Sequence, residues 1–358
     1  MPELVSVTLR RLALPLVRPY RLSYRVFEVC EPFLVEVRDD QGRTGLADAH
    51  ISPGSSAETR DGGWAFLDRH IRAALGQDPP AVKDAVLAEF AASKVAATAL
   101  VTAIEDMERD PLLDLPQAVR LPLLTPVNQT EEAAIRAEIE DWLAQGFRTF
   151  KVKVGKDVQA DLRRVGWIQS AVAGRATLRL DANRAFDRDQ GVRFAAGLDP
   201  AGIELLEQPC DADDRDANAA VAAACPVPLM LDEPICTLDD IARAATIPNV
   251  GYCKLKLKRF GGLSRLAQGL QAVQDAGMQA VLGDGLGSEL HNWMEACLAS
   301  RFIRNAGEFN GFLKTRDRLF ANPMTFADGA IHLPAGYRPQ PDPQRIDRAT
   351  AERQDYAL

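Results

Sequence analysis

The sequence has few cysteines, no excess of positive charge and no long apolar run. Its six cysteines are scattered and include no CxxC pair, so they predict neither a zinc site nor a disulfide framework. No apolar run approaches the roughly 20 residues that a membrane span needs. The net charge of −8 and the pI near 5.2 argue against a surface for nucleic acid or anionic membrane. These absences favour a protein that binds a small molecule.

The first residues lack the charged and then apolar order of a signal peptide. Val5, Val7 and Leu9 alternate with polar residues instead, which is the period of a half-buried strand. We therefore expect a cytoplasmic protein.

The pattern of residues 1–120 differs from that of the rest of the chain. Short alternating runs, such as Phe33–Val37, precede a stretch at 81–107 that is rich in Ala and Val and has no Gly or Pro. This order predicts an α+β domain with an antiparallel meander followed by a helix. Residues 50–64, which are rich in Gly, Ser and Pro, predict a mobile loop between the two.

From residue 121 onward, short apolar runs alternate with helical stretches. We expect strands at Leu121–Val127, Phe147–Val154, Leu178–Leu180, Ile203–Leu206, Leu229–Leu231, Tyr252–Leu257, Ala280–Leu282 and Glu308–Phe312. Strands that alternate with helices imply a parallel sheet, and this many units imply closure into a (β/α) barrel over 121–320. The segment 321–358, which contains five prolines between 323 and 343, is expected to return to the first domain.

Polar residues end most of these apolar runs at a nearly constant spacing. Intervals of 28, 26, 25, 24 and 28 residues separate Lys153, Asp181, Glu207, Asp232, Lys256 and Asp284. This period corresponds to one strand plus one helix. In a parallel barrel the six side chains would lie at the same end, which is where such barrels carry out chemistry.

Three consecutive strand ends carry carboxylates. Asp181, Glu207 and Asp232 end the runs LRLD, ELLE and LMLD, and burial of carboxylates there without a cation would be costly. A divalent ion with oxygen ligands removes that cost. Mg²⁺ fits because it keeps positions open for water or substrate, and Mn²⁺ is the alternative ion.

Lysines on two strands would flank these carboxylates. The period of a strand puts Lys151 and Lys153 on one face, and Lys254, Lys256 and Lys258 on one face of another strand. Mutual repulsion and a nearby metal would lower the pKa of these ammonium groups, which would allow a neutral amine to accept a proton. The two strands lie roughly across the barrel from one another, so the lysines could approach opposite faces of one carbon.

The segments KVKVG, LRLDANRAF, ELLEQP, LMLDEP and KLKRFGG together resemble the enolase superfamily, specifically its muconate-lactonizing-enzyme subgroup. The resemblance covers most of the chain. It implies a modified TIM (β/α)7β-type barrel with an α+β capping domain, and assembly into a homo-oligomer. It also implies abstraction of a proton α to a carboxylate, with Mg²⁺ stabilising an enediolate intermediate.

The resemblance also implies roles for individual residues. Lys153 and Lys256 match the two acid/base residues, and Lys151 supports Lys153. The matched metal ligands are Asp181, Glu207 and Asp232, and the accompanying polar residues are Asn183 and Glu233. The run LPLVRPYRLSY, with Tyr20 and Tyr24, matches the mobile loop over the family's site.

Other positions depart from the family's pattern and bear on the substrate. The cap signature GxGE appears here as GLADAH, with Asp48 at the glutamate position, and Asp284 stands on strand seven between two glycines. Dipeptide epimerases carry an Asp-x-Asp pair on strand eight that holds the substrate's ammonium, whereas this chain has Glu308 and Asn310. An N-substituted or cyclic amino acid is therefore favoured over a dipeptide. His50, at the start of the cap loop, is a further candidate for substrate contact.

The predicted reaction is racemisation or epimerisation of an amino-acid derivative, because both bases are present. Dehydration or cycloisomerisation of a carboxylate substrate by the same half-reaction is the alternative. His291 lies seven residues beyond Asp284 and is expected on a helix, which disfavours the histidine-based mandelate-racemase pattern. A Schiff-base aldolase using Lys256 and a barrel that only binds ligands remain as further alternatives.

Overall fold

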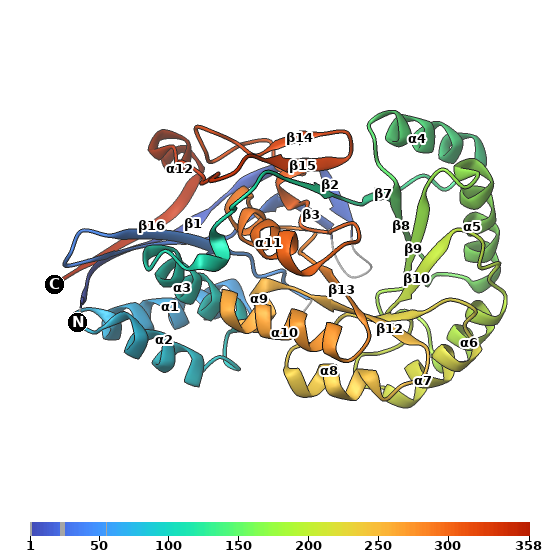
Figure 1. Ribbon diagram of the computed structural model, residues 1–358, viewed down its shortest axis with the longest axis horizontal. Coiled ribbons are helices and arrows are strands. Elements are labelled where there is room, and N and C mark those ends of the chain that lie inside the picture. Colours follow the sequence, from blue (N-terminus) through green and yellow to red (C-terminus); the bar gives the residue numbers. More distant parts are fainter. Residues whose placement is uncertain (1, 22–25, 55) are drawn as a thin grey trace.

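The computed structural model describes residues 2–21, 26–54 and 56–358. They form a barrel of alternating strands and helices beside a cap in which the two ends of the chain meet (Figure 1). Tyr24, a candidate for substrate contact, lies outside the described residues. Among the residues described, no helix combines the length and the apolar character needed to cross a membrane.

The cap is built on an antiparallel sheet with the strand order β16-β1-β4-β5. Its strands are β1 (Leu4–Leu12), β4 (Phe33–Asp39), β5 (Thr44–Ala49) and β16 (Thr350–Ala357). The last strand of the chain thus pairs with the first. A hairpin of β2 (Leu14–Arg21) and β3 (Val26–Cys30) follows β1, and a bridge between Leu16 and Thr315 ties it to the segment after the barrel.

Three helices complete the cap: α1 (Arg60–Ala74), α2 (Pro79–Ala88) and α3 (Lys94–Met107). The predicted loop over 50–64 is too long, because Thr59 caps α1 by accepting a hydrogen bond from Gly62 N. The single helix predicted over 81–107 is also wrong, since a turn at 89–93 separates α2 from α3. Nearly every side of α3 is buried, and it packs against β4 and β5. Tertiary packing sets this boundary, which no helix-breaking residue marks.

Seven parallel strands form the barrel sheet, and their order in space follows their order in sequence. They are β7 (Thr125–Val127), β8 (Thr149–Lys153), β9 (Thr177–Asp181), β10 (Ile203–Glu207), β11 (Leu229–Leu231), β12 (Val250–Leu255) and β13 (Gln279–Leu282). The helices are α4 (Glu132–Ala144), α5 (Val158–Val172), α6 (Arg188–Ala196), α7 (Arg215–Ala224), α8 (Leu238–Ala245), α9 (Leu257–Phe260), α10 (Leu263–Asp275) and α11 (Glu289–Phe302). This alternation confirms the predicted barrel with a cap.

The eighth position of the barrel is filled by two residues only. Gly307 N donates to Pro122 O at 2.9 Å, Leu124 N donates to Gly307 O at 3.1 Å, and Glu308 N donates to Leu282 O at 2.9 Å. These bonds connect β13 back to the start of the sheet. The predicted strand Glu308–Phe312 is wrong beyond this point, because the chain turns into the 3₁₀ helix η2 (Gly311–Leu313).

Smaller elements lie between the barrel and the cap. The strands β14 (Thr325–Ala327), β15 (Ala330–Leu333) and β6 (Val119–Pro122) form a small antiparallel sheet, and η1 (Pro111–Leu113) and α12 (Pro343–Ala349) complete the described structure.

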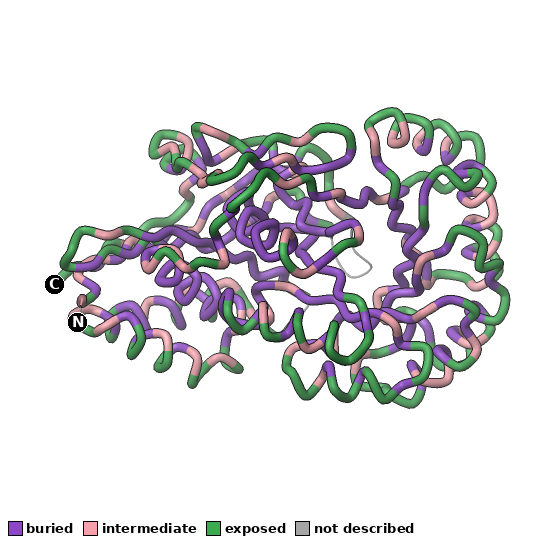
Figure 2. The backbone as a smooth tube through the Cα atoms, in the orientation of Figure 1, coloured by how far each residue is buried: buried purple, intermediate pink, exposed green. Residues whose placement is uncertain are grey.

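Helix α11 joins the cap to the barrel. Its residues from Glu289 to Ala299 are all buried, and it contacts β5 on one side and β13 on the other. Asp48 of β5 accepts hydrogen bonds from Ser288 Oγ at 2.6 Å and from His291 N at 2.9 Å. His291 therefore lies on a helix, as predicted, and fixes the cap. Figure 2 shows buried segments in the cap sheet and the barrel strands, and exposed ones on the outer helices.

Candidate active site

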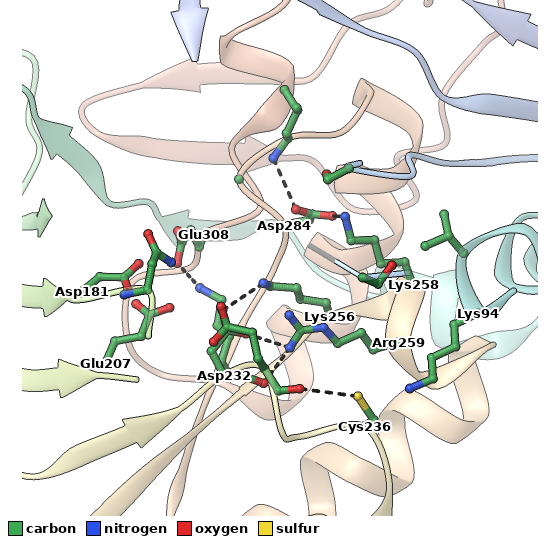
Figure 3. A pocket seen from close by; sticks show the side chains of 18 of the residues that line it. Lys94, Asp181, Glu207, Asp232, Cys236, Lys256, Lys258, Arg259, Asp284 and Glu308 are labelled. Atoms are coloured by element: carbon green, nitrogen blue, oxygen red, sulfur yellow. Dashed lines mark hydrogen bonds and ion pairs between the residues drawn. The ribbon is translucent and has the colours of Figure 1, made fainter. Parts of the chain in front are cut away.

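A cavity of about 210 Å³ lies at the carboxyl ends of the barrel strands, below the cap (Figure 3). Its barrel side is formed by charged side chains from consecutive strand ends. The cap contributes Tyr20, Ser52, Ser56, Glu58, Lys94 and Val95. The cavity is thus enclosed by both parts of the fold.

The three predicted carboxylates lie together in this cavity. Asp181 and Glu207 are the last residues of β9 and β10 and stand opposite each other in the register of the sheet, and Asp232 directly follows β11. All three are buried, at 0%, 1% and 3% exposure. Asp181 and Glu207 lie side by side, since each has a carboxylate oxygen 2.8 Å from Lys151 Nζ. Burial and the negative charge of Asp181 raise the pKa of Glu207.

The two lysines of β8 contact these carboxylates. Lys151 Nζ lies 2.8 Å from Asp181 Oδ2 and 2.8 Å from Glu207 Oε2, and Lys153 Nζ lies 2.5 Å from Asp181 Oδ2. Lys153 also donates to Asn183 Oδ1 at 2.5 Å. Burial alone would lower the pKa of Lys151, but Asp181 and Glu207 outweigh burial and raise it. The lowering of the lysine pKa expected from the sequence involves a nearby metal ion, so it stays a prediction.

Lys254 of β12 approaches the same centre from across the barrel. It forms a buried ion pair with Glu308, and Glu308 Oε1 also lies 2.8 Å from Lys151 Nζ. Burial and repulsion by Lys151 lower the pKa of Lys254 well below its usual range. Glu308, predicted to contact substrate, lines the cavity, and its carboxylate is paired with two lysines of the protein.

Lys256 follows β12 and contacts the third carboxylate. Its Nζ donates to Asp232 Oδ2 at 3.1 Å, and Arg259 donates to the Oδ1 and the backbone carbonyl of Asp232 at 2.8 and 2.6 Å. The adjacent Glu233 also lines the cavity, 3.5 Å from Arg184 Nε. The side chains of Asp232, Lys256 and Arg259 converge in Figure 3.

Lys258 was predicted to lie on the same face of a strand as Lys254 and Lys256, but it does not lie on that strand. The chain enters the short helix α9 at Leu257, and Lys258 forms an ion pair with Asp284 and donates to the backbone carbonyl of His50 at 3.2 Å. His50 is only 2% exposed and is not among the described residues that line the cavity. Burial lowers its pKa to about 3. The structure therefore places His50 behind the cavity wall, away from the predicted substrate contact.

Two further candidates, Tyr20 and Asn310, meet at one lysine. Tyr20 lines the cavity, and Lys314 Nζ lies 4.8 Å from the centroid of its ring. Asn310 Oδ1 accepts a hydrogen bond from Lys314 Nζ at 2.7 Å. The amide oxygen expected to face substrate is thus already bonded to an ammonium group of the chain.

Comparisons with known proteins agree with this geometry. Residues 134–339 match the family model described as enolase C-terminal domain-like. The chain belongs to the enolase superfamily. It is 29% identical over 332 residues to the L-Lys-D/L-Arg epimerase of Methylococcus capsulatus, covering 86% of this chain and 91% of that protein. It is 26% identical over 369 residues to muconate cycloisomerase 1 of Rhodococcus opacus, covering 93% and 94%.

A solved structure shows the same fold over nearly the whole chain. The crystal structure of N-succinyl Arg/Lys racemase from Bacillus cereus superposes with a TM-score of 0.90 at 20% identity, covering 99% of this chain and 100% of that one. The chain thus groups with the muconate-lactonizing-enzyme-like members of the enolase superfamily. The epimerases, racemases and cycloisomerases among its relatives are isomerases, which supports an isomerase.

Enzymes of the enolase superfamily generally use a divalent metal. As arranged here, no three acidic, histidine or cysteine side chains of the described residues form a ready set of ligands, because the oxygens of Asp181 and Asp232 face lysines and arginine. The donors are nonetheless all oxygens, and Glu207 Oε1 is buried without a hydrogen-bond partner among the described residues. The residues fit a hard divalent cation that replaces the ammonium groups as counter-charge.

Arg259 and Lys314 are among the residues near the site that the sequence patterns missed. Arg259 stands inside the motif KLKRFGG. Because it lies just before the glycine pair, it could have been predicted to follow the strand-end lysine into a short helix. Lys314 lies in no motif, and only the turn after Glu308 brings it to Tyr20. A pattern of strand ends cannot reveal a residue placed by an irregular segment.

Proposed function

We propose that this protein catalyses Mg²⁺-dependent racemisation or epimerisation of an amino-acid derivative, N-substituted or cyclic, by transfer of the proton α to a carboxylate. One observation carries the proposal: Lys153 and Lys256 contact different members of one group of three carboxylates in one cavity. A substrate carbon held between these lysines has a proton donor or acceptor available on each side.

The two lysines have complementary roles in the proposed reaction. The amine of one lysine removes the α-proton, and the ammonium of the other returns a proton to the opposite face. Asn183 holds Lys153 Nζ from one side and Arg259 holds Asp232, so the chain fixes the lysines and the carboxylates against one another. Buried Lys151 supplies positive charge next to Asp181 and Glu207.

Asp181, Glu207 and Asp232 would hold the metal ion, with Glu233 next to them. Bound there, Mg²⁺ would neutralise the negative charge that develops on the substrate carboxylate as the proton leaves. The all-oxygen donor set supports Mg²⁺ or Mn²⁺ over softer metals.

The relatives support this reaction and also an alternative. One is an epimerase and another is a muconate cycloisomerase, so elimination or cycloisomerisation after the same proton abstraction is the second candidate. Membership of the superfamily favours both over the Schiff-base aldolase and over a protein that only binds ligands.

The test is exchange of α-hydrogen for solvent deuterium, followed by mass spectrometry and chiral chromatography, with N-acylated amino acids, proline derivatives, dipeptides and sugar acids. Mg²⁺-dependent exchange that scrambles the configuration supports racemisation. Loss of water or a change of ring identifies the alternative. No exchange with any acid contradicts the proposal.

Two broader expectations accompany the proposal. We propose that the protein acts in the cytoplasm and that it assembles as a homo-oligomer, as expected from resemblance to the superfamily. Light scattering coupled to gel filtration tests the second expectation, and a monomer at micromolar concentration contradicts it.

A further inference from the structure

Lys254 and Glu308 form a buried ion pair in the wall of the cavity, and the proposed reaction uses neither residue. Lys254 is 1% exposed and Glu308 is 7% exposed. Lys254 Nζ donates to Glu308 Oε2, and Lys151 Nζ donates to Glu308 Oε1 at 2.8 Å. Amine groups of the chain therefore occupy both oxygens of this carboxylate.

Glu308 lies midway between the two strands that carry these lysines. Its position in the barrel is flanked by β13 and by the start of β7, and the next strands on either side are β12 with Lys254 and β8 with Lys151. Four side chains from alternate strands commonly pack together inside such barrels, and most of them are apolar. Here the alternate strands contribute charges whose sign alternates around the barrel: Lys151, Glu207, Lys254 and Glu308.

The two lysines differ in their other contacts. Lys151 Nζ also lies 2.8 Å from Asp181 and from Glu207, whereas Glu308 is the carboxylate that Lys254 contacts within the described part of the chain. A buried ion pair is often no more stable than apolar side chains of the same size, so stability does not explain this pair. Lys254 donates an N–H group in either protonation state, so the lowering of its pKa by burial and by Lys151 leaves the contact in place.

Glu308 is close to the centre of the proposed reaction. Lys151 Nζ lies 2.8 Å from Glu308 and equally far from Asp181 and Glu207, so one ammonium group separates Glu308 from two of the proposed metal ligands. A positively charged nitrogen near the reacting carbon would approach this carboxylate. It would find both oxygens occupied and would be repelled by Lys151.

The other carboxylates of the cavity bear on where a substrate's positive charge can bind. On the barrel side each is paired with a lysine or arginine of the chain: Asp181, Glu207, Asp232, Glu233 and Asp284. On the cap, Glu58 accepts hydrogen bonds from Ser93 Oγ at 2.8 Å and Val95 N at 3.1 Å, and Lys94 lines the cavity beside it. Among the described residues, the cap side thus presents both signs of charge and favours neither at a remote part of the substrate.

We infer that Lys254 determines specificity by occupying Glu308, so that the substrate is an N-acyl amino acid with no positively charged nitrogen near the reacting carbon. This rests on the proposed function and narrows it. Free cyclic amino acids, N-alkyl amino acids and dipeptides with a free amino end all carry such a charge and are excluded. Removal of Lys254 frees Glu308 Oε2 and should admit them.

Pairs of ligands of equal size test this assignment. N-propionylmethionine and glycylmethionine differ by a methyl group against an ammonium group, and N-acetylmethionine and N-ethylmethionine differ by an amide against a protonated amine. Titration calorimetry in the presence of Mg²⁺ measures binding, and α-hydrogen exchange is measured separately.

The variants separate the charge of the lysine from its contact with Glu308. Lys254→Met and Lys254→Leu remove the amine, Lys254→Arg keeps a charged donor, and a double variant combines Lys254→Met with Glu308→Gln. Lys156→Met is the control at an exposed lysine beyond β8. Circular dichroism and the Tm establish that each variant is folded.

The wild-type protein should bind the uncharged member of each pair more tightly. Lys254→Met should strengthen binding of the charged members about 10- to 100-fold, as for gain of a charged hydrogen bond, and should lower their KM more than it changes kcat. A purely structural role of Lys254 would instead weaken both members alike. Lys254→Arg and Lys156→Met should keep the wild-type preference, and the double variant should lose the gain because Glu308 no longer carries a charge.

Several outcomes would overturn the role of Lys254. They are equal wild-type affinity for the two members of each pair, which needs no variant, an unchanged preference in folded Lys254→Met or Lys254→Leu, a gain that persists in the double variant, and no binding of any of the four compounds at millimolar concentration. Wild-type exchange as fast with the charged as with the uncharged members keeps the proposed reaction and rejects the role of Lys254. A Lys254-dependent preference in binding without any exchange keeps that role and rejects the reaction.

Discussion

Lys153 Nζ lies 2.5 Å from Asp181 Oδ2, and Lys256 Nζ lies 3.1 Å from Asp232 Oδ2. Asp181 and Asp232 belong to β9 and to the end of β11, with Glu207 of β10 between them. The two lysines therefore contact the outer members of a row of three carboxylates, and each approaches it from a different strand.

Replacing either lysine should separate the two directions of proton transfer. We expect Lys153→Ala to lose exchange with one enantiomer and Lys256→Ala with the other, each by about 10²- to 10⁴-fold, which is the usual contribution of a general acid or base. Exchange in deuterium oxide from each pure enantiomer, followed by proton NMR, measures this. Lys156→Ala is the control. Equal loss for both enantiomers in both variants would contradict the two-base arrangement.

Removal of the metal should abolish exchange reversibly. After chelation the three carboxylates keep only lysine and arginine as counter-charges, so added Mg²⁺ should restore activity and should bind measurably in calorimetry. Glu207→Gln should weaken that binding at least about 10-fold, since one charged ligand is lost. Asp189→Asn, at an exposed position on α6, should bind Mg²⁺ normally. Full activity in the presence of chelator would be incompatible with the proposal.

Gly283 should be essential for stability because it lies against the backbone of Glu308 and Phe309, where the barrel closes. Its φ is 124°, and a Cβ there would lie 2.3 Å from Phe309 N. Gly283→Ala should therefore cost about 3 kcal/mol or more. Gly277→Ala should cost only about 1 kcal/mol, because its φ of 73° is unfavourable for alanine but nothing lies within 4 Å. Urea unfolding measures the free energy of unfolding of both variants. If both lose a similar amount, neighbouring atoms must move to relieve the crowding at Gly283.

His291 should make stability depend on pH on the alkaline side. Burial lowers its pKa, but Glu295 outweighs burial and, with Asp48 and Asp284, raises the pKa to about 9 from an ordinary 6.5. Because the folded value is higher, the protonated form favours folding. This contribution is fully present below about pH 6.5 and is lost as the pH rises toward 9.

The matching measurement compares wild type with His291→Gln. The wild-type advantage in the free energy of unfolding should be largest near pH 6 and should shrink steadily to about pH 9. An advantage independent of pH would mean that His291 stabilises the helix by packing alone.

The sequence predicted the barrel well because its strands and helices alternate with a regular period. Asp181, Glu207 and Asp232 follow from that period alone, since the carboxyl ends of parallel strands meet at one edge. Lys258 and Glu308 were placed less well, because α9 starts directly after Lys256 and the eighth position is only two residues long. Local pattern does not encode such breaks in regularity. His50 and Lys314 depend on contacts between the cap and the barrel, which no single segment reveals.

The pairing of β16 with β1 has a consequence for synthesis of the chain. β1 leaves the ribosome early and can pair with β4 on one side, but its other edge has no partner until residues 350–357 are made. At about 5–20 residues per second this interval lasts roughly 20 to 70 seconds. During that time the nascent cap exposes an unpaired strand edge, which is a site for association with other chains. Chaperones that cover such edges during translation should therefore contribute more to folding of the cap than to folding of the barrel.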